Sequence, residues 1–301
     1  MKTQKFISSR KNSKTKSTDK PCKVSPQQTF GIYTEANEFE QKAKSLSKKL
    51  SVPFISALSD NYEFLLHFTE KGIALIQPKK NAPGPILIDF VSGKLDHRRR
   101  FGGGKNQAIA KAVGYKPSSP PSILDATAGL GHDAFVLATL GCNIMLIERS
   151  PILVVLLKDA LQRARSNLSE IIARMHLLQE DSIKYMHDLP LKKKPDVVYL
   201  DPMFPKRSKS AKVKKEMIAL QKLTLLFPQQ AEITTLKNKT YIQNNFLNEN
   251  ENNANLFANA LKCALKRVVV KRPRIAPYFN EVEPAIQFLG KSSRFDVYLL
   301  S

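Results

Sequence analysis

One loop carries residues whose types and spacing suit the binding of a nucleoside cofactor. It runs from Asp125 to Asp133 with the letters DATAGLGHD, between the apolar pair Ile123-Leu124 and the apolar helical pattern from Ala134 to Leu140. A strand, a glycine turn and a helix in this order let a ligand approach bare backbone at a helix N-terminus. Glu148 ends the next apolar run, where an acid of a βαβ unit would accept hydrogen bonds from ribose hydroxyls.

A second loop combines an acid, a stiff turn and an aromatic ring. It follows the apolar run from Val197 to Leu200 and reads Asp201-Pro202-Met203-Phe204-Pro205. With the glycine loop, it indicates a nucleoside-cofactor enzyme that acts on a planar substrate. The plainer interpretation is a strand that ends in a proline turn with a buried Phe204.

The elements that must position these loops alternate in type from about residue 106 onward. A helix is predicted at Asn106 to Val113, and strands are predicted near residues 123, 144, 175, 197 and 268, separated by helical patterns. This rhythm favours an α/β fold with a doubly wound parallel sheet. A further strand-like run, Phe295 to Leu299, is expected at or near a sheet edge.

The chain before this region has a different pattern. Residues 26–95 combine a helix-like stretch, Glu35 to Leu50, with strand-like runs at Glu63 to Phe68, Ile73 to Gln77 and Ile86 to Phe90. The letters TEKG at residues 69–72 suggest a hairpin. We therefore expect a small N-terminal α+β domain at 26–95 and a cofactor-binding domain at 96–301, with a polar loop excursion at the Asn-rich segment 228–256.

The formal net charge of +22 is the clearest compositional signal. Charge of this sign and size favours a polyanionic partner, with nucleic acid the natural candidate. Residues 1–25 are basic and rich in Ser, Thr and Asn, so they are expected to form a disordered tail. A mitochondrial transit peptide is a less favoured interpretation, because such peptides prefer Arg over Lys and form amphipathic helices.

Composition also narrows the class of protein. The longest aliphatic run, Ile152 to Leu157, is too short to cross a bilayer, and the N-terminus lacks the apolar segment of a signal peptide, so a cytoplasmic protein is expected. The three cysteines, Cys22, Cys142 and Cys263, are scattered without C-x-x-C spacing. Neither a disulfide framework nor a metal site is predicted.

A resemblance to a known family rests on five ordered motifs. These are HRRRFGGGK (97–105), DATAGLGHDAFVLATLGC (125–142), ER (148–149), YLDPMFPKRSKSAKVKKEM (199–217) and KRVVVKRP (266–273). In this order they resemble the bacterial ribosomal RNA small subunit methyltransferase J family, over roughly residues 60 to 300. The resemblance implies a class I, Rossmann-like fold, S-adenosylmethionine as cofactor, and methylation of the exocyclic N2 of a guanine in 16S rRNA.

The resemblance also implies roles for the residues of the two loops. Gly129 and Gly131 would let the backbone wrap the methionine part of the cofactor, and Asp125 would hold its ammonium group or cap the following turn. Glu148 suits the ribose diol. The remaining residues that the resemblance places at the cofactor are His132, Asp133, Arg149, Asp181, Ser182 and Asp201.

The segment from Asp201 to Phe204 resembles the motif of enzymes that methylate exocyclic amines. Such an amine is a poor nucleophile because its lone pair is delocalised into the ring. Asp201 and the Pro202 carbonyl could accept its hydrogen bonds and align it for attack on the methyl group. Phe204 could stack on the base, a contact worth about 1–3 kcal/mol. Met203 stands where the general motif has a second proline.

Basic residues beside these loops would bind the 16S rRNA or small ribosomal subunit through its backbone, or would form a solvated charged face. The predicted RNA contacts are Arg98, Arg99, Arg100, Lys105, Lys206, Arg207, Lys209, Lys271 and Arg272. Selectivity would require the guanine to leave its stack.

Two alternatives belong to other classes. A dinucleotide oxidoreductase would use the same glycine turn, although Ala134 stands at the third glycine position and the second loop has no role in hydride transfer. A noncatalytic RNA-binding or ribosome-assembly protein would explain the charge, but it would have no need of the ordered cofactor acids.

Overall fold

The computed structural model describes residues 28–102, 104–202, 241–290 and 292–300. Its first sheet has four strands: β1 (Gln28–Tyr33), β2 (Phe54–Ile55), β3 (Tyr62–Thr69) and β4 (Gly72–Ile76). Their order is β2-β1-β3-β4, and helix α1 (Asn37–Leu50) joins β1 to β2. The pairing of β3 with β4 is antiparallel, so the predicted hairpin is confirmed.

The second sheet has seven strands. They are β5 (Ile123–Asp125), β6 (Ile144–Glu148), β7 (Met175–Gln179), β8 (Val197–Leu200), β9 (Arg267–Pro273), β10 (Ile286–Leu289) and β11 (Ser293–Leu299). The order is β10-β11-β9-β8-β5-β6-β7. The strands from β9 to β7 pair in parallel, whereas β11 runs antiparallel to both of its neighbours.

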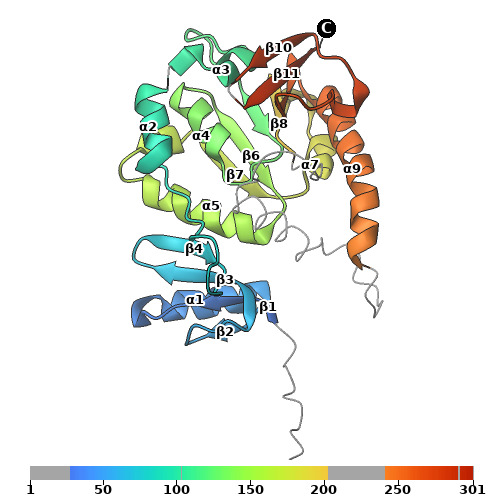
Figure 1. Cartoon of the computed structure of the whole chain (residues 1–301). Helices are drawn as coiled ribbons and strands as arrows, with labels where there is room; N and C mark the ends of the chain where they lie inside the picture. Colours follow the sequence, from blue (N-terminus) through green and yellow to red (C-terminus); the bar gives the residue numbers. More distant parts are fainter. Residues whose placement is uncertain (1–27, 103, 203–240, 291, 301) are drawn as a thin grey trace, which may run out of the picture.

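Helices precede the first strand of this sheet and connect several of the others (Figure 1). They are α2 (Gly93–Phe101), α3 (Ala108–Ala112), α4 (His132–Thr139), α5 (Pro151–Ala164), α6 (Ser169–Ile172), α7 (Ser182–Asp188) and α9 (Tyr241–Cys263). Short 3-10 turns lie at Gly104–Asn106, Leu191–Lys193 and Phe279–Glu281.

Helices cover both faces of the large sheet. Neighbouring residues of a strand point to opposite sides, so each strand contributes side chains to the core on both faces. On β8, Val197 and Tyr199 pack into one buried cluster, which includes residues of α4 and α5. Val198 and Leu200 pack into the other, which includes residues of α7 and α9. All four side chains of β8 are therefore buried, and its sequence is a continuous apolar run. The predicted α/β fold with a doubly wound, mostly parallel sheet is confirmed.

The small sheet packs onto the large one through α5, which lies between them in Figure 1. Asp159 of α5 accepts a hydrogen bond from the Ile73 N–H of β4 at 3.1 Å. Arg163, one turn further along α5, donates to the Ile88 carbonyl oxygen at 2.7 Å. One buried cluster contains both Phe64 of β3 and Leu157 of α5, so the apolar core is continuous. The domain boundary near residue 95 stays a prediction.

The second half of the expected polar loop at 228–256 is helical, which is a correction, while residues 228–240 lie outside the described part of the chain. Leu256, Phe257, Ala260 and Cys263 fall at helical spacing and are buried against the sheet. The many asparagines between the apolar positions hide this periodicity, and packing of the apolar stripe decides the conformation.

Two smaller differences and one agreement concern the predicted strands. The expected strand at Ile86 to Phe90 is reduced to a single bridge between Ile86 and Leu75. The predicted run at Phe295 to Leu299 belongs to β11, which lies next to the edge. The edge strand itself is β10, which sequence reasoning missed because its residues are largely exposed and have no alternating pattern. The predicted tail at residues 1–25 lies outside the described residues.

Candidate functional site

A pocket of about 330 Å³ opens where the parallel strands β5, β6 and β8 end. The carboxyl ends of parallel strands lie at the same edge of a sheet. Here β5 pairs with β6 on one side and with β8 on the other, and the chain continues from β5 to β6. This is the switch point at which doubly wound sheets bind ligands. The lining includes Asp125, Thr127, Gly129, His132, Asp133, Glu148, Arg149, Asp181, Ser182, Tyr199, Asp201, Pro202, Asn252, Asn253, Leu256 and Lys271.

The glycine turn contributes bare backbone at one position only. Gly129 lines the pocket with a φ of 53°, and a Cβ atom there would meet only the Thr127 carbonyl oxygen, at 3.8 Å. Gly131, with a φ of 69°, is not among the lining residues. A Cβ atom at Gly131 would lie 2.8 Å from Leu157 Cδ1 of α5. Gly131 therefore lets the turn before α4 approach Leu157 closely, and its role at the cofactor stays a prediction.

Asp125 ends β5 with a side chain that is almost fully buried, although it lines the pocket. Its Oδ1 accepts the Thr127 N–H at 3.1 Å, so the predicted turn-capping contact is present. Burial raises the pKa of Asp125 to about 8, and the neighbouring carboxylates of Asp133, Asp201 and Glu148 add to the effect while the Thr127 N–H opposes it. A cationic ligand group beside Asp125 would favour its ionised form.

Glu148 at the end of β6 is held by two backbone donors. Its Oε2 accepts the Gly129 N–H at 2.9 Å and its Oε1 accepts the Ser150 N–H at 2.8 Å. Burial raises the pKa of Glu148, and the two N–H donors oppose that shift. Each carboxylate oxygen accepts more than one hydrogen bond, so both can still receive a hydroxyl from the pocket. Arg149, the next residue, is exposed at the rim.

Asp181 and Ser182 form the start of α7. Asp181 caps the helix, because its Oδ1 accepts the Lys184 N–H at 3.0 Å. The Ser182 hydroxyl donates to the Ala126 carbonyl oxygen at 2.6 Å, which joins the loop after β7 to the glycine loop after β5. The structure thus brings residues of two separate predicted motifs to one wall of the pocket.

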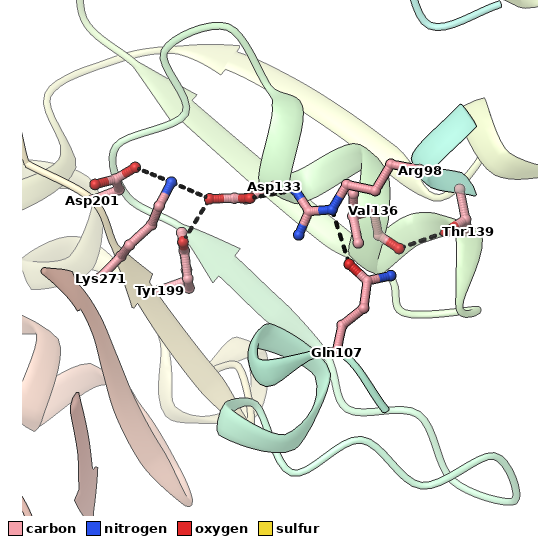
Figure 2. Close-up of polar contacts among 8 residues, drawn as sticks. All are labelled: Arg98, Gln107, Asp133, Val136, Thr139, Tyr199, Asp201 and Lys271. Carbon is pink, nitrogen blue, oxygen red and sulfur yellow. Dashed lines mark hydrogen bonds and ion pairs between the residues drawn. The ribbon is translucent and has the colours of Figure 1, made fainter. Parts of the chain in front are cut away.

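The opposite wall holds a chain of charged side chains (Figure 2). Lys271 Nζ of β9 lies 2.7 Å from Asp133 Oδ2 and 2.8 Å from Asp201 Oδ2. The Tyr199 hydroxyl donates to Asp133 Oδ2 at 2.8 Å, and Arg98 Nη1 lies 3.3 Å from Asp133 Oδ1. The Lys271 ammonium therefore bridges Asp133, at the start of α4, and Asp201, which follows β8.

The pKa values of these groups reflect burial opposed by pairing. Burial would raise the pKa of Asp133, but Lys271, Arg98 and the Tyr199 hydroxyl together hold it below its usual value. Burial raises the pKa of Asp201; Lys271 opposes this and Asp133 adds to it. For Lys271, burial alone would lower the pKa, but the two carboxylates raise it above its usual value, so the ammonium is charged.

Asp201 is placed by backbone as well as by charge. Its N–H donates to Thr127 Oγ1 at 2.6 Å, which ties the loop after β8 to the loop after β5. Pro202 is buried beside it and lines the pocket. Phe204, the proposed stacking ring, lies outside the described residues, as do Lys206, Arg207 and Lys209.

The structure corrects two of the predicted RNA contacts. Lys271 lies inside the pocket wall, paired to two acids, and is not a residue of an outer rim. Arg272 points to the other face of the sheet and is 7% exposed; its guanidinium donates to the Pro277 carbonyl oxygen at 2.8 Å. Lys271 and Arg272 point in opposite directions because successive side chains of a strand such as β9 face opposite sides of the sheet.

The remaining predicted RNA contacts lie beside α4. Residues 98–100 form part of helix α2, and Lys105 is exposed in the following 3-10 turn. Arg99 and Arg100 both pair with Asp96 one turn back, at 2.5 and 2.8 Å. Arg98 donates to Gln107 at 2.9 Å in addition to its contact with Asp133.

No group of acids, histidines or cysteines suited to hold a metal ion, and no helix able to span a membrane, occurs in the described ranges.

Sequence reasoning missed several residues of the site. Thr127 and Tyr199 hold the acids in place, and Asn252, Asn253 and Leu256 of α9 line the pocket. Tyr199 lies two residues before Asp201, so its side chain and that of Asp201 are on the same face of the strand, which is a signal that the sequence carried. The contribution of α9 had no such signal, because it depends on a contact between distant parts of the chain.

The donor set of the pocket fits S-adenosylmethionine. Buried Asp125 suits an ammonium group, Glu148 suits a ribose diol, and Asp181 with Ser182 forms a polar wall beyond Glu148. A volume of about 330 Å³ lies within the range of small-molecule sites. The fold and this pocket together define the class of S-adenosylmethionine-dependent methyltransferases.

Comparison with known proteins gives the family within that class. A family model described as "Putative SAM-dependent methyltransferase" matches residues 46–225 and 223–300. Proteins named ribosomal RNA small subunit methyltransferase J are similar over most of the chain. The protein from Cellvibrio japonicus is 42% identical over 274 residues, which cover 87% of this chain and 94% of the relative. The protein from Coxiella burnetii is 42% identical over 259 residues, with 86% and 92% covered.

A solved structure agrees with the sequence relatives. A SAM-dependent methyltransferase from Neisseria gonorrhoeae superimposes with a TM-score of 0.64 at 30% sequence identity, covering 90% of this chain and 96% of that chain. The chain belongs to the ribosomal RNA small subunit methyltransferase J family of SAM-dependent methyltransferases. The oxidoreductase interpretation of the glycine turn is therefore set aside.

Proposed function

We propose that this enzyme transfers a methyl group from S-adenosylmethionine to the exocyclic N2 of a guanine in 16S rRNA. The observation that carries the proposal is the position of Asp201 and Pro202, which line the same pocket as the cofactor-type acids Asp125 and Glu148. The names of the relatives support small-subunit rRNA as the substrate. Ribosomal subunits occur in the cytoplasm, where we expect the enzyme to act.

The residues have distinct tasks in this reaction. Asp125 would hold the ammonium group of the cofactor and Glu148 its ribose diol, and the sulfonium supplies an electrophilic methyl group when the cofactor is bound. Asp201 and the Pro202 carbonyl accept hydrogen bonds from the N2 hydrogens and align the nitrogen with that methyl group. The N2 lone pair forms the new N–C bond as the S–C bond breaks, and N2 then releases one proton.

A weak base is sufficient to accept the proton that N2 releases after methyl transfer. Once N2 has formed its new bond it carries a positive charge, so it is a strong acid and readily gives its proton to the Asp201 carboxylate or to water. Asp201 therefore acts mainly through alignment, which is consistent with a carboxylate paired to Lys271 at 2.8 Å. The predicted stacking of Phe204 on the base and the phosphate contacts of Arg98, Arg99, Arg100 and Lys105 remain parts of the proposal.

Methyl transfer from labelled S-adenosylmethionine to small ribosomal subunits that lack the modification tests the function. Nuclease digestion and mass analysis should find N2-methylguanosine at one site of the 16S rRNA. Naked 16S rRNA, assayed in parallel, shows which form is the substrate. Methylation at another atom, or no transfer by a protein that binds the cofactor, would contradict the proposal.

The matched variant for this assay is Asp201→Ala. We expect it to lose turnover almost completely while it keeps its thermal unfolding temperature, because the Asp201 side chain is 40% exposed and contributes little packing. Asp188→Ala is the control, since Asp188 is an exposed acid at the end of α7 with a side chain 61% exposed. Equal activity of Asp201→Ala and the control would exclude the proposed role.

A further inference from the structure

The pairing of β9 with β8 places a lysine against the proposed acceptor acid. Leu200 of β8 pairs with Val270 of β9, so the residues that follow them, Asp201 and Lys271, lie side by side. Lys271 Nζ lies 2.8 Å from Asp201 Oδ2, and its side chain is 28% exposed. This contact joins residues that are 70 positions apart in the chain.

Lys271 is the group that fixes the Asp201 carboxylate. Within the described ranges, the Lys271 ammonium makes the hydrogen bond to the Asp201 side chain, whereas Thr127 contacts only its backbone N–H. Asp133 is better supported, because it is held by Lys271, the Tyr199 hydroxyl and Arg98. The two acids therefore differ: Asp133 anchors Lys271, and Lys271 holds Asp201.

We propose that Lys271 is a positioning residue for methyl transfer, which keeps the Asp201 carboxylate ionised and turned toward the acceptor amine. This inference rests on the proposed function. An ionised carboxylate is an acceptor only, so both of its oxygens can receive N–H groups of the acceptor amine. A protonated Asp201 would present a donor to an amine that must itself donate, and the alignment would be lost.

The electrostatics of the site make this role necessary. Asp201 shares the pocket with three further acids, Asp133 of α4, Asp125 of β5 and Glu148 of β6. Burial and the neighbouring Asp133 raise the pKa of Asp201, and Lys271 is the cation that opposes them. Arg98 of α2 faces Asp133, and Tyr199 of β8 donates to the same acid. Without Lys271, Asp201 would retain a proton at higher pH.

Lys271→Met tests the role, because methionine keeps the length of the side chain and removes the charge. We expect kcat to fall by about 100-fold or more, with the KM for S-adenosylmethionine changed by less than about 3-fold. The acid limb of the kcat profile should move upward by about one pH unit. Lys271→Arg, which keeps the charge, should recover part of kcat and restore the position of the acid limb.

Lys266→Met is the matched control. Lys266 precedes β9 at the end of the sheet opposite the pocket, its side chain is 63% exposed, and it pairs with Asp196 at 2.7 Å. This variant should keep the kcat and the pH profile of the wild type. If Lys271→Met keeps the wild-type kcat, or if it loses only cofactor affinity, the positioning role is overturned.

Two further measurements separate this inference from a folding defect and from failure of the proposed function. The double variant with Lys271→Met and Asp133→Asn removes one charge of each sign; it should fold and still lack kcat, and recovered kcat would contradict the role. Carboxyl ¹³C NMR, with Asp201→Asn to assign the signal, should show a higher pKa for Asp201 in Lys271→Met than in the wild type. This readout needs no RNA, so an unchanged pKa overturns the inference even if the substrate proves to be a different one.

Discussion

Five carboxylates line the pocket. Asp181 caps α7, and the other four differ in how their charge is balanced. Asp133 and Asp201 share the ammonium of Lys271, and Glu148 is held by two backbone N–H groups. Asp125 has the Thr127 N–H as its partner and is 3% exposed. Compared with Asp133, Asp201 and Glu148, Asp125 therefore has the ionised form whose free energy depends most on what occupies the pocket.

The binding of S-adenosylmethionine should release a proton from Asp125. Burial raises the pKa of Asp125 to about 8, so near neutral pH the carboxyl is mostly protonated in the free protein. An ammonium group beside it favours the ionised form and lowers that pKa. Affinity should therefore rise with pH between about pH 6 and pH 8, and calorimetry in buffers of different ionisation enthalpy should report proton release.

Asp125→Asn is the control for this measurement. The amide cannot titrate, so the variant should bind the cofactor more weakly and release only the protons that come from the cofactor itself. Ser122, at the other end of β5, provides a comparison, because Ser122→Ala should leave the proton release unchanged. Equal proton release by the wild type and Asp125→Asn would show that another group titrates on binding.

Among the elements, the glycine turn before α4 lies close against α5. Gly131 has a φ of 69°, and Leu157 Cδ1 of α5 would lie 2.8 Å from a Cβ atom at this position. Ser150 begins α5 with its hydroxyl as acceptor for the Leu153 N–H, and Pro151 follows. The left-handed backbone and the close approach of Leu157 both favour glycine at position 131.

Gly131→Ala should therefore destabilise the protein through both conformation and packing. Gly93 separates the two causes, because its φ is 68° while nothing lies within 4 Å of a Cβ atom there. Gly93→Ala should cost about 1 kcal/mol from the left-handed backbone alone. Gly131→Ala should cost about 1–3 kcal/mol more, from overpacking against Leu157. Urea unfolding curves give both values, and equal costs would mean that the packing at Gly131 adapts freely.

At the scale of the whole molecule, the two sheets share one apolar cluster. Phe64 and Leu66 of the small sheet belong to the same buried cluster as Leu157 of α5. Asp159 and Arg163 of α5 bind the backbone of residues 73 and 88, so polar contacts reinforce this junction. The predicted domain at 26–95 is thus built against the methyltransferase fold.

We expect the two sheets to unfold as one cooperative unit. Saturating S-adenosylmethionine, at about 100 times its Kd, should stabilise the folded state by about 2.7 kcal/mol. Hydrogen exchange should show this gain in the amides of β3 as well as in those of β5, although β3 does not line the pocket. Protection of β5 without β3 would indicate a separate N-terminal domain.

Asp159→Ala tests the junction itself. It removes the acceptor of the Ile73 N–H and should destabilise the protein by about 1–3 kcal/mol. Glu40→Ala provides the contrast, because the Glu40–Lys44 pair on α1 is exposed, and its loss should cost less than about 1 kcal/mol. Similar effects of the two substitutions would mean that the junction contributes little.

The order of the elements and the positions of the acids at the strand ends follow from local patterns in the sequence. Asp125, Glu148 and Asp201 could be predicted because each follows a short apolar run, and because the glycine turn is a local pattern. Parallel strands place such residues at one edge whatever the details of packing. These properties depend on residues that are close together in the chain.

Only the tertiary structure decided the partners of those acids. Lys271 faces Asp201 because β9 pairs with β8, and no local pattern shows which of Lys271 and Arg272 points to the pocket. Likewise, the apolar stripe at Leu256 and Phe257 makes α9 a helix when it packs on the sheet, although its sequence predicted a polar loop. Contacts between residues far apart in the chain form only when the core assembles, so the sequence left these choices open.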